Sequence, residues 1–162
     1  MSSKKVVKMV KSGDVKKKVD VLERLLLLKI LPNQGSYTNL MLVRKIREQL
    51  SFTEAEHKRL QFRNETGEDG QPMLHWNTIC LKNKETGAIV TLPDPVLRGM
   101  LAKDPDKFTD VPACPPKELF FGEVIEGLIK KALLDLDKSE QLPADYVSLY
   151  EKFVQPAAEI GE

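Results

Sequence analysis

The side chains best suited to metal binding or acid–base chemistry are few in this chain and lie far apart in the sequence. There are two histidines, His57 and His75, and two cysteines, Cys80 and Cys114. His57 belongs to a charged segment and is interpreted as a surface residue. His75 and Cys80 are five positions apart on a predicted strand, where alternation places them on opposite faces. Because a zinc site needs three or four ligands at a recognisable spacing, no metal site is predicted.

Motifs that bind nucleotide phosphates or build a nucleophilic active site do not occur in the sequence: it contains no GxxxxGK[ST], GxGxxG or GxSxG pattern. Cys114 has no general base near it in the sequence, so we interpret it as an inert thiol. Paired carboxylates such as Glu54 and Glu56 are two positions apart and do not face each other on a helix. The sequence therefore predicts a protein that is not an enzyme and needs no cofactor. An active site assembled from distant residues is the alternative.

Charge is distributed unevenly along the 162 residues. Residues 1–18 contain seven lysines and one acidic residue, which gives this segment a net charge of +6. Residues 19–100 have a net charge of +1, and residues 101–162 have a net charge of −6. The first segment is interpreted as a solvated leader with a short amphipathic turn at residues 6–10. Its alternative roles are to contact anions, or to lie on the acidic C-terminal region of the same chain or of a second copy.

Apolar periodicity predicts three helices in the first part of the chain. Residues 19–31 are apolar nearly all round, which is typical of a helix central to a core, and Pro32 ends this segment. Residues 38–50 form a second predicted helix, with Arg47 among the charged side chains on its exposed side. Thr53 followed by Glu56 is a capping box that opens a third helix to about Leu60.

The second part of the chain mixes strands and helices. Residues 73–81 and 88–92 are predicted strands joined by a hairpin turn at 83–87, and residues 61–63 are a candidate for a short additional strand. Asp94 is expected to cap a helix through residue 103 that has Pro95 at its first position. A proline-rich connector, residues 104–116, precedes the longest helix, predicted at 117–137, and a last helix follows at 144–154. The glycines Gly122 and Gly127 are interpreted as sites of close helix packing.

The predicted fold class is α+β, mostly helical, with five or six helices and one antiparallel β-hairpin. The predicted organisation is a flexible lysine-rich leader (residues 1–18), a single globular domain (19–156) with a possible subdivision at 104–116, and a frayed tail (157–162). No apolar run is long enough to span a bilayer, and no secretory signal is expected at the start of the chain. Together with two free cysteines, these features predict a cytoplasmic protein without membrane contacts.

The functional hypothesis that follows is a small regulatory or adaptor-type protein that binds another protein, or a second copy of itself, through apolar helical faces. The residues expected to contact the partner are Trp76, an aromatic anchor on a predicted strand, and Phe120 and Phe121 on the longest predicted helix.

Nucleic-acid binding is the alternative function, because three helices followed by a hairpin in residues 19–92 match the order of elements in a winged helix. Helices 38–60 and the basic leader would contact the nucleic acid. Glu54 and Glu56 weaken this hypothesis, since both would repel phosphate at the start of the helix that enters the groove. The residues expected to contact phosphates are Lys4, Lys5, Lys16, Lys17, Lys18, Lys58, Arg59 and Arg63.

Overall fold

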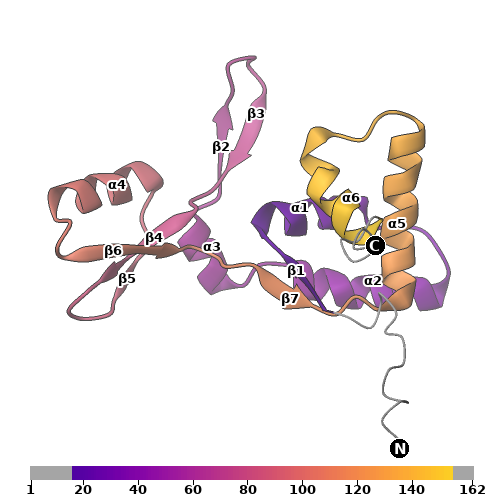
Figure 1. The fold of residues 1–162 in the computed structure, drawn as a ribbon, viewed down its shortest axis with the longest axis horizontal. Coiled ribbons are helices and arrows are strands. Elements are labelled where there is room, and N and C mark those ends of the chain that lie inside the picture. Colours follow the sequence, from indigo (N-terminus) through magenta and orange to yellow (C-terminus); the bar gives the residue numbers. More distant parts are fainter. Residues whose placement is uncertain (1–15, 155–162) are drawn as a thin grey trace, which may run out of the picture. The chain divides into compact units, whose positions relative to one another are not determined.

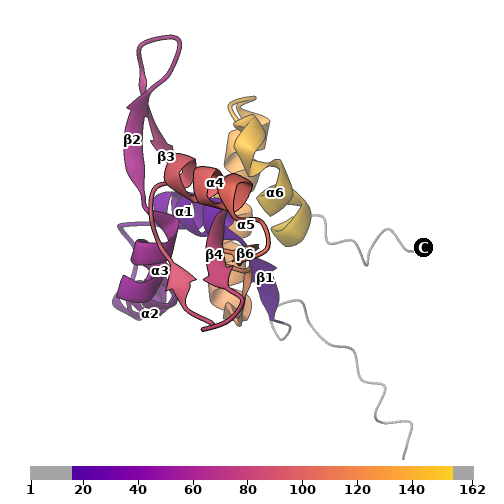
Figure 2. The same ribbon diagram turned by 90° about the vertical axis from the view of Figure 1, so that its left-hand side faces the viewer.

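The computed structural model describes residues 16–154, which form six α-helices, one 3-10 turn and seven short β-strands (Figures 1 and 2). The predicted α+β class is confirmed. The chain forms two compact units: unit 1 contains the residues up to Ser51 and those from Pro116 onward, and unit 2 contains residues Phe52–Pro115. The elements are β1 (Lys17–Val19), α1 (Val21–Ile30), α2 (Tyr37–Leu50), α3 (Glu54–Leu60), β2 (Arg63–Thr66), β3 (Pro72–His75), β4 (Ile79–Asn83), β5 (Ile89–Val90), α4 (Asp94–Lys103), β6 (Phe108–Pro112), β7 (Lys117–Leu119), α5 (Gly122–Lys138), the 3-10 turn η3 (Ala144–Tyr146) and α6 (Val147–Phe153).

Unit 1 consists of α1, α2, α5, η3, α6 and a two-stranded antiparallel sheet of β1 and β7. A capping box starts α1, because the Asp20 carboxylate accepts a hydrogen bond from the N–H of Glu23 and the Glu23 carboxylate accepts one from the N–H of Asp20. The core between the helices contains the fully buried side chains of Leu27, Leu50 and Leu133. The leucine-rich first helix is therefore central to unit 1, as its pattern predicts.

Two arginines join α1 and α2 by capping the C-terminal end of the opposite helix. Nε of Arg24 in α1 donates to the carbonyl of Leu50 at the end of α2, at 3.0 Å. Arg47 in α2 donates to the carbonyls of Leu28 and Leu31 at the end of α1, at 3.1 and 2.9 Å. A guanidinium at these positions satisfies carbonyls that have no intrahelical partner and faces the negative end of the helix dipole. Arg47, expected on the exposed side, is therefore half-buried.

Unit 2 consists of α3, the β2–β3 hairpin, a three-stranded antiparallel sheet in the order β5–β4–β6, and α4. The capping box predicted at the start of α3 is confirmed, with hydrogen bonds from the N–H of Glu56 to the Thr53 hydroxyl and from the N–H of Thr53 to the Glu56 carboxylate. Helix α4 packs on the sheet, and Leu81, Leu97 and Phe108 form the buried centre of this unit.

The predicted hairpin is present, because β4 and β5 pair antiparallel with Leu81 opposite Val90 and Lys82 opposite Ile89. It is not the only β-structure, because the described residues form three small antiparallel sheets. The segment predicted as one strand is interrupted at residues 76–78. Its first part is β3, which pairs with β2, while its second part is β4. The proline-rich connector supplies β6, which pairs with β4 from Ile79 opposite Pro112 to Asn83 opposite Phe108. Strand β6 pairs with residues some 30 positions away, so the local sequence gives little indication of it. It lies at the edge of the sheet, where proline is tolerated.

The longest helix begins later than predicted. Residues Lys117–Leu119 are extended in β7, and α5 begins only at Gly122, which adopts a φ of +83°. Phe120 and Phe121 therefore precede the helix instead of lying on its face. At α4, Asp94 is the first helical residue, and the capping position is held by Pro93.

The predicted leader also differs from the structure at its end, because Lys17 and Lys18 belong to β1 and pair with β7. The rest of the leader up to residue 15, including Lys4 and Lys5, and the predicted tail at 157–162 lie outside the described residues. The elements of the predicted winged-helix order are divided between the units: α1 and α2 belong to unit 1, whereas α3 and the β4–β5 hairpin belong to unit 2.

Candidate functional site: an apolar groove in unit 1

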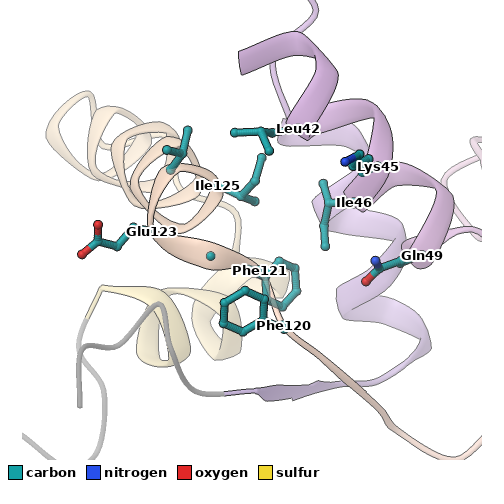
Figure 3. A pocket seen from close by; sticks show the side chains of 10 residues that line it. Leu42, Lys45, Ile46, Gln49, Phe120, Phe121, Glu123 and Ile125 are labelled. Atoms are coloured by element: carbon teal, nitrogen blue, oxygen red, sulfur yellow. The ribbon is translucent and has the colours of Figure 1, made fainter. Parts of the chain in front are cut away.

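A groove lies between the second half of α2 and the junction of β7 with α5 (Figure 3). We call it the α2–α5 groove. Its cavity has a volume of about 350 Å³, at the small end of ligand-binding pockets. Seven of the ten lining residues are apolar side chains or glycine, so the groove suits apolar groups. The lining residues are Leu42, Lys45, Ile46 and Gln49 from α2, and residues 120–125 from the junction.

The junction gives two neighbouring phenylalanines opposite environments. Phe121 is 5% exposed, and its ring packs edge-to-face on Phe153, with ring centroids 5.1 Å apart. Phe120 is 50% exposed at the groove. The change of direction at Gly122, with its positive φ, requires a residue without a Cβ, since the left-handed region is costly for other residues. The turn therefore keeps one ring in the core and leaves the other in contact with solvent.

The two walls of the groove are apolar and their rims carry opposite charges. Ile46 is buried and Leu42 half-buried on the α2 side, and Val124 is 44% exposed on the α5 side. Lys45 is exposed on the α2 rim. Glu123 is exposed on the α5 rim, where its carboxylate points away from α2 in Figure 3. The lining residues include no histidine, cysteine or serine, so the groove resembles a binding surface more than a reaction centre.

A second hollow opens between the other ends of the same two helices. Its volume is about 310 Å³, and residues of α2 and α5 line most of it. Its wall includes Leu40 and Leu128, and its rim carries Lys131 and Asp135, whose charged atoms are 3.5 Å apart. The exposed large side chains Phe120 and Val124 do not line it, so the α2–α5 groove offers more accessible apolar surface.

The three predicted protein-binding residues do not share one unit. Phe120 and Phe121 both line the α2–α5 groove, although only Phe120 is accessible. Trp76 belongs to unit 2, between β3 and β4, and is half-buried. Its ring lies 6.0 Å from that of Phe62, which in turn contacts the rings of Phe52 and His57. Trp76 is therefore one member of an aromatic cluster that packs α3 against the segment around β3.

The described residues predicted to contact phosphates are also divided between the units, and two of them are engaged by other groups. Lys58 and Arg59 are exposed on α3, whereas Arg63 donates to the carboxylate of Glu65 and to the side-chain oxygen of Asn77. In unit 1, Nζ of Lys17 lies 3.6 Å from the carboxylate of Glu126, while Lys16 and Lys18 are exposed. The nearby acids reduce the charge that Arg63 and Lys17 could offer to phosphate.

The histidines and cysteines have separate environments within unit 2. His75 lies 3.6 Å from the Glu65 carboxylate, and because it belongs to β3 while Cys80 belongs to β4, strand alternation does not relate the two. Burial raises the pKa of the Cys80 thiol, and the nearby Arg59 only partly opposes this effect. Sγ of Cys114 lies 3.6 Å from the Glu56 carboxylate. Within residues 16–154, no group of three or more histidine, cysteine, aspartate or glutamate side chains is placed to hold a metal ion.

A comparison with known proteins finds no family model that matches the chain, no similar curated protein and no similar solved structure. In the described part of the chain, every helix is too short or too polar to cross a lipid bilayer. The sequence identifies Phe120 and Phe121 as candidates, but it gives no indication of Leu42 and Ile46 as the opposite wall. The adjacent Gly122 is the one local signal that the phenylalanines end a strand instead of continuing a helix.

Proposed function

We propose that this chain is a non-enzymatic binding protein of regulatory or adaptor type, whose α2–α5 groove takes up apolar side chains of an amphipathic helix from another protein. The observation that carries the proposal is that Phe120 and Val124 are 50% and 44% exposed beside an open cavity with apolar walls. Exposed apolar surface costs about 25 cal/mol per Å² relative to its burial. Large apolar side chains that gather around a hollow therefore favour a partner that covers them.

The shape and charge of the groove define the chemistry of the partner. An amphipathic helix can insert apolar side chains between two walls while its polar face stays in water. Lys45 on one rim would pair with an acidic residue of the partner, and Glu123 on the other rim would pair with a basic one. Such rim pairs add specificity more than affinity. A small polar metabolite fits less well, because its binding needs several converging polar groups, and the groove supplies three polar side chains, on its rims.

Selection from a displayed peptide library tests this proposal. The library would contain peptides of about 16 residues, roughly four helical turns, and the full chain would be the target. We expect the selected peptides to share apolar residues three and four positions apart. We also expect Phe120→Asp to weaken their binding about tenfold or more, because it places a charge in the apolar wall. Lys45→Glu should weaken the binding of those peptides that carry an acidic residue beside their apolar positions.

Val147→Asp is the matched control. Val147 is 48% exposed on α6 and lines neither hollow, so its replacement should leave peptide affinity unchanged. If no helical peptide is selected, or if Phe120→Asp and Val147→Asp affect binding equally, the groove is not the binding surface. Gel-shift measurements with DNA and RNA on the same preparation test the alternative function. Binding that Lys58→Glu or Arg59→Glu abolishes would favour nucleic acid as the partner.

A further inference from the structure

We infer that the α2–α5 groove has a ligand within the same chain, namely residues 6–10, whose sequence is Val-Val-Lys-Met-Val. These residues lie outside the part that the structure describes. Where the described fold begins, the length of the connecting chain and the chemistry of the segment all support its binding to the groove. The inference rests on the proposed function in one respect, because the groove must accept apolar side chains. It adds that a partner has to displace a segment of the protein itself.

The pairing of β1 with β7 places the start of the described chain near the groove. The antiparallel register places Lys17 opposite Leu119 and Lys18 opposite Glu118. Continuing this register by one position places residue 16 at the level of Phe120, the first residue of the groove wall. Nζ of Lys17 is also held 3.6 Å from the carboxylate of Glu126 in α5. The described part of the chain therefore begins beside the groove.

The segment is long enough to reach every part of the groove. Val10 precedes Lys16 by six residues, and an extended chain covers about 3.3 Å per residue, or roughly 20 Å in total. The α2 wall from Leu42 to Gln49 rises about 1.5 Å per residue, or roughly 10 Å. The connecting residues 11–15 can therefore place the apolar side chains against either wall.

The chemistry of the segment matches the groove. Four of its five residues are apolar, and Val6, Met9 and Val10 are spaced so that they would share one face of a helical turn. Methionine adapts its shape to irregular apolar surfaces. The flanking lysines carry charge opposite to Glu123 on the α5 rim and to Glu118, which is exposed on β7. Lys45 repels them, so the lysines would lie toward α5.

Tethering makes even a weak contact effective. A short connection gives the segment a local concentration in the millimolar range, so an intrinsic dissociation constant of that order suffices to fill the groove much of the time. An external helix must then compete with the segment. The apparent affinity of the external helix equals its intrinsic affinity multiplied by the fraction of molecules in which the groove is uncovered.

Site-specific photocrosslinking in the full chain tests the inference. A benzoylphenylalanine introduced in place of Met9 should crosslink to peptides that contain residues 42–49 or 120–125, in a species with the mass of one chain. The same probe in place of Ser3, outside the apolar run, is the matched control and should give much less of this product. Phe120→Asp should reduce the product about fivefold, in line with the loss of an apolar contact. Absence of these crosslinks, or an equal yield from position 3, overturns the inference. Crosslinks with the mass of two chains overturn it as well, by showing that a second copy is the occupant.

A separate measurement distinguishes the two proposals. In the double variant Val6→Asp and Val10→Asp, the library peptides should bind about twofold more tightly than to the unaltered chain, because their competitor is weakened. Tighter peptide binding together with intramolecular crosslinks supports both proposals. Peptide binding without crosslinks leaves the proposed function standing and refutes the internal ligand. Crosslinks without any peptide selected, even on the double variant, leave the internal ligand standing and refute the external partner.

Discussion

Glu23 is a buried carboxylate whose charge is satisfied from three directions. It is 2% exposed, and it accepts hydrogen bonds from the Ser148 hydroxyl, from Nζ of Lys152 and from the N–H of Asp20. Burial by itself raises the pKa of this carboxyl group, but the hydrogen bonds from Lys152, Asp20 and Ser148 together lower it below its ordinary value of 4.5. The ionised form of Glu23 therefore helps to hold α6 on α1.

The pKa of Glu23 is lower in the folded than in the unfolded chain. Its ionisation therefore stabilises the fold fully at pH values above 4.5, and this contribution is lost as the pH falls through the folded-state pKa. We expect Glu23→Gln to lower the free energy of unfolding by about 1–3 kcal/mol at neutral pH, and by less in acid. Urea unfolding followed by far-UV circular dichroism over a pH series measures this difference. Glu151→Gln, an exposed position on α6, is the control and should change stability by less than about 0.5 kcal/mol. If the loss of unfolding free energy in Glu23→Gln were the same at every pH, the stabilising role of ionised Glu23 would be contradicted.

Residue-level predictions succeed where the partners are close in the sequence. The capping box of Thr53 and Glu56 is found because both hydrogen bonds join residues three positions apart. The partners of Glu23 on α6 are 125 and 129 positions away, and the carbonyl that Arg24 caps in Leu50 is 26 positions away. Apolar periodicity treats such charged side chains as surface residues and cannot show which of them reach buried partners.

At the level of elements, the start of α5 shows what one backbone conformation decides. Leu119, Phe120 and Phe121 extend the apolar face of this helix toward Pro116, which is why the sequence predicts a single helix from residue 117. The structure instead pairs residues 117–119 with β1, about 100 positions earlier in the chain, and Gly122 changes the chain direction. The prediction fails because the pairing partner is remote, and the same reason hides β6 within the proline-rich connector. Helices α1, α2 and α3 are predicted well because their signals are local.

Two glycine-to-alanine substitutions in α5 should have opposite effects. Gly122 has a φ of +83°, and its added Cβ would meet one atom of Phe120 at 3.7 Å, so the cost comes from the backbone. We expect Gly122→Ala to lower the free energy of unfolding by about 1–2 kcal/mol. An added Cβ at Gly127 meets nothing within 4 Å, which contradicts the expectation of close helix packing there. Gly127→Ala should stabilise by about 0.5–1 kcal/mol, because alanine has the higher helix propensity.

Thermal and urea unfolding of the two alanine variants, each compared with the unaltered chain, measures these changes. Each variant serves as the control for the other, since both add one methyl group to the same helix. The same sign of change for both would show that the conformation of Gly122 does not limit this position.

At the level of the whole molecule, unit 1 is discontinuous in sequence, because unit 2 is inserted between its elements α2 and β7. The candidate groove depends on this arrangement, because its two walls come from residues 42–49 and 120–125, on either side of the insertion. The sequence predicts each wall as an apolar segment but cannot bring the two together. The insertion also divides the elements of the predicted winged-helix order, because α1 and α2 belong to unit 1 and α3 belongs to unit 2.

The two units contain separate buried centres, and this predicts how far the destabilisation caused by a core mutation extends. Leu81 is fully buried in unit 2 among Leu97 and Phe108, and Leu133 is fully buried in unit 1. We expect Leu81→Ala to lower the free energy of local opening by about 2–5 kcal/mol within unit 2 and to leave α1 and α5 of unit 1 unchanged. Leu133→Ala is the reciprocal variant, with its loss confined to unit 1. Hydrogen exchange followed by mass spectrometry resolves both units in one experiment. Because the walls of the groove belong to unit 1, Leu81→Ala should also retain peptide binding, whereas Leu133→Ala should weaken it. Faster exchange throughout the chain in both variants would show that the units unfold as one cooperative body.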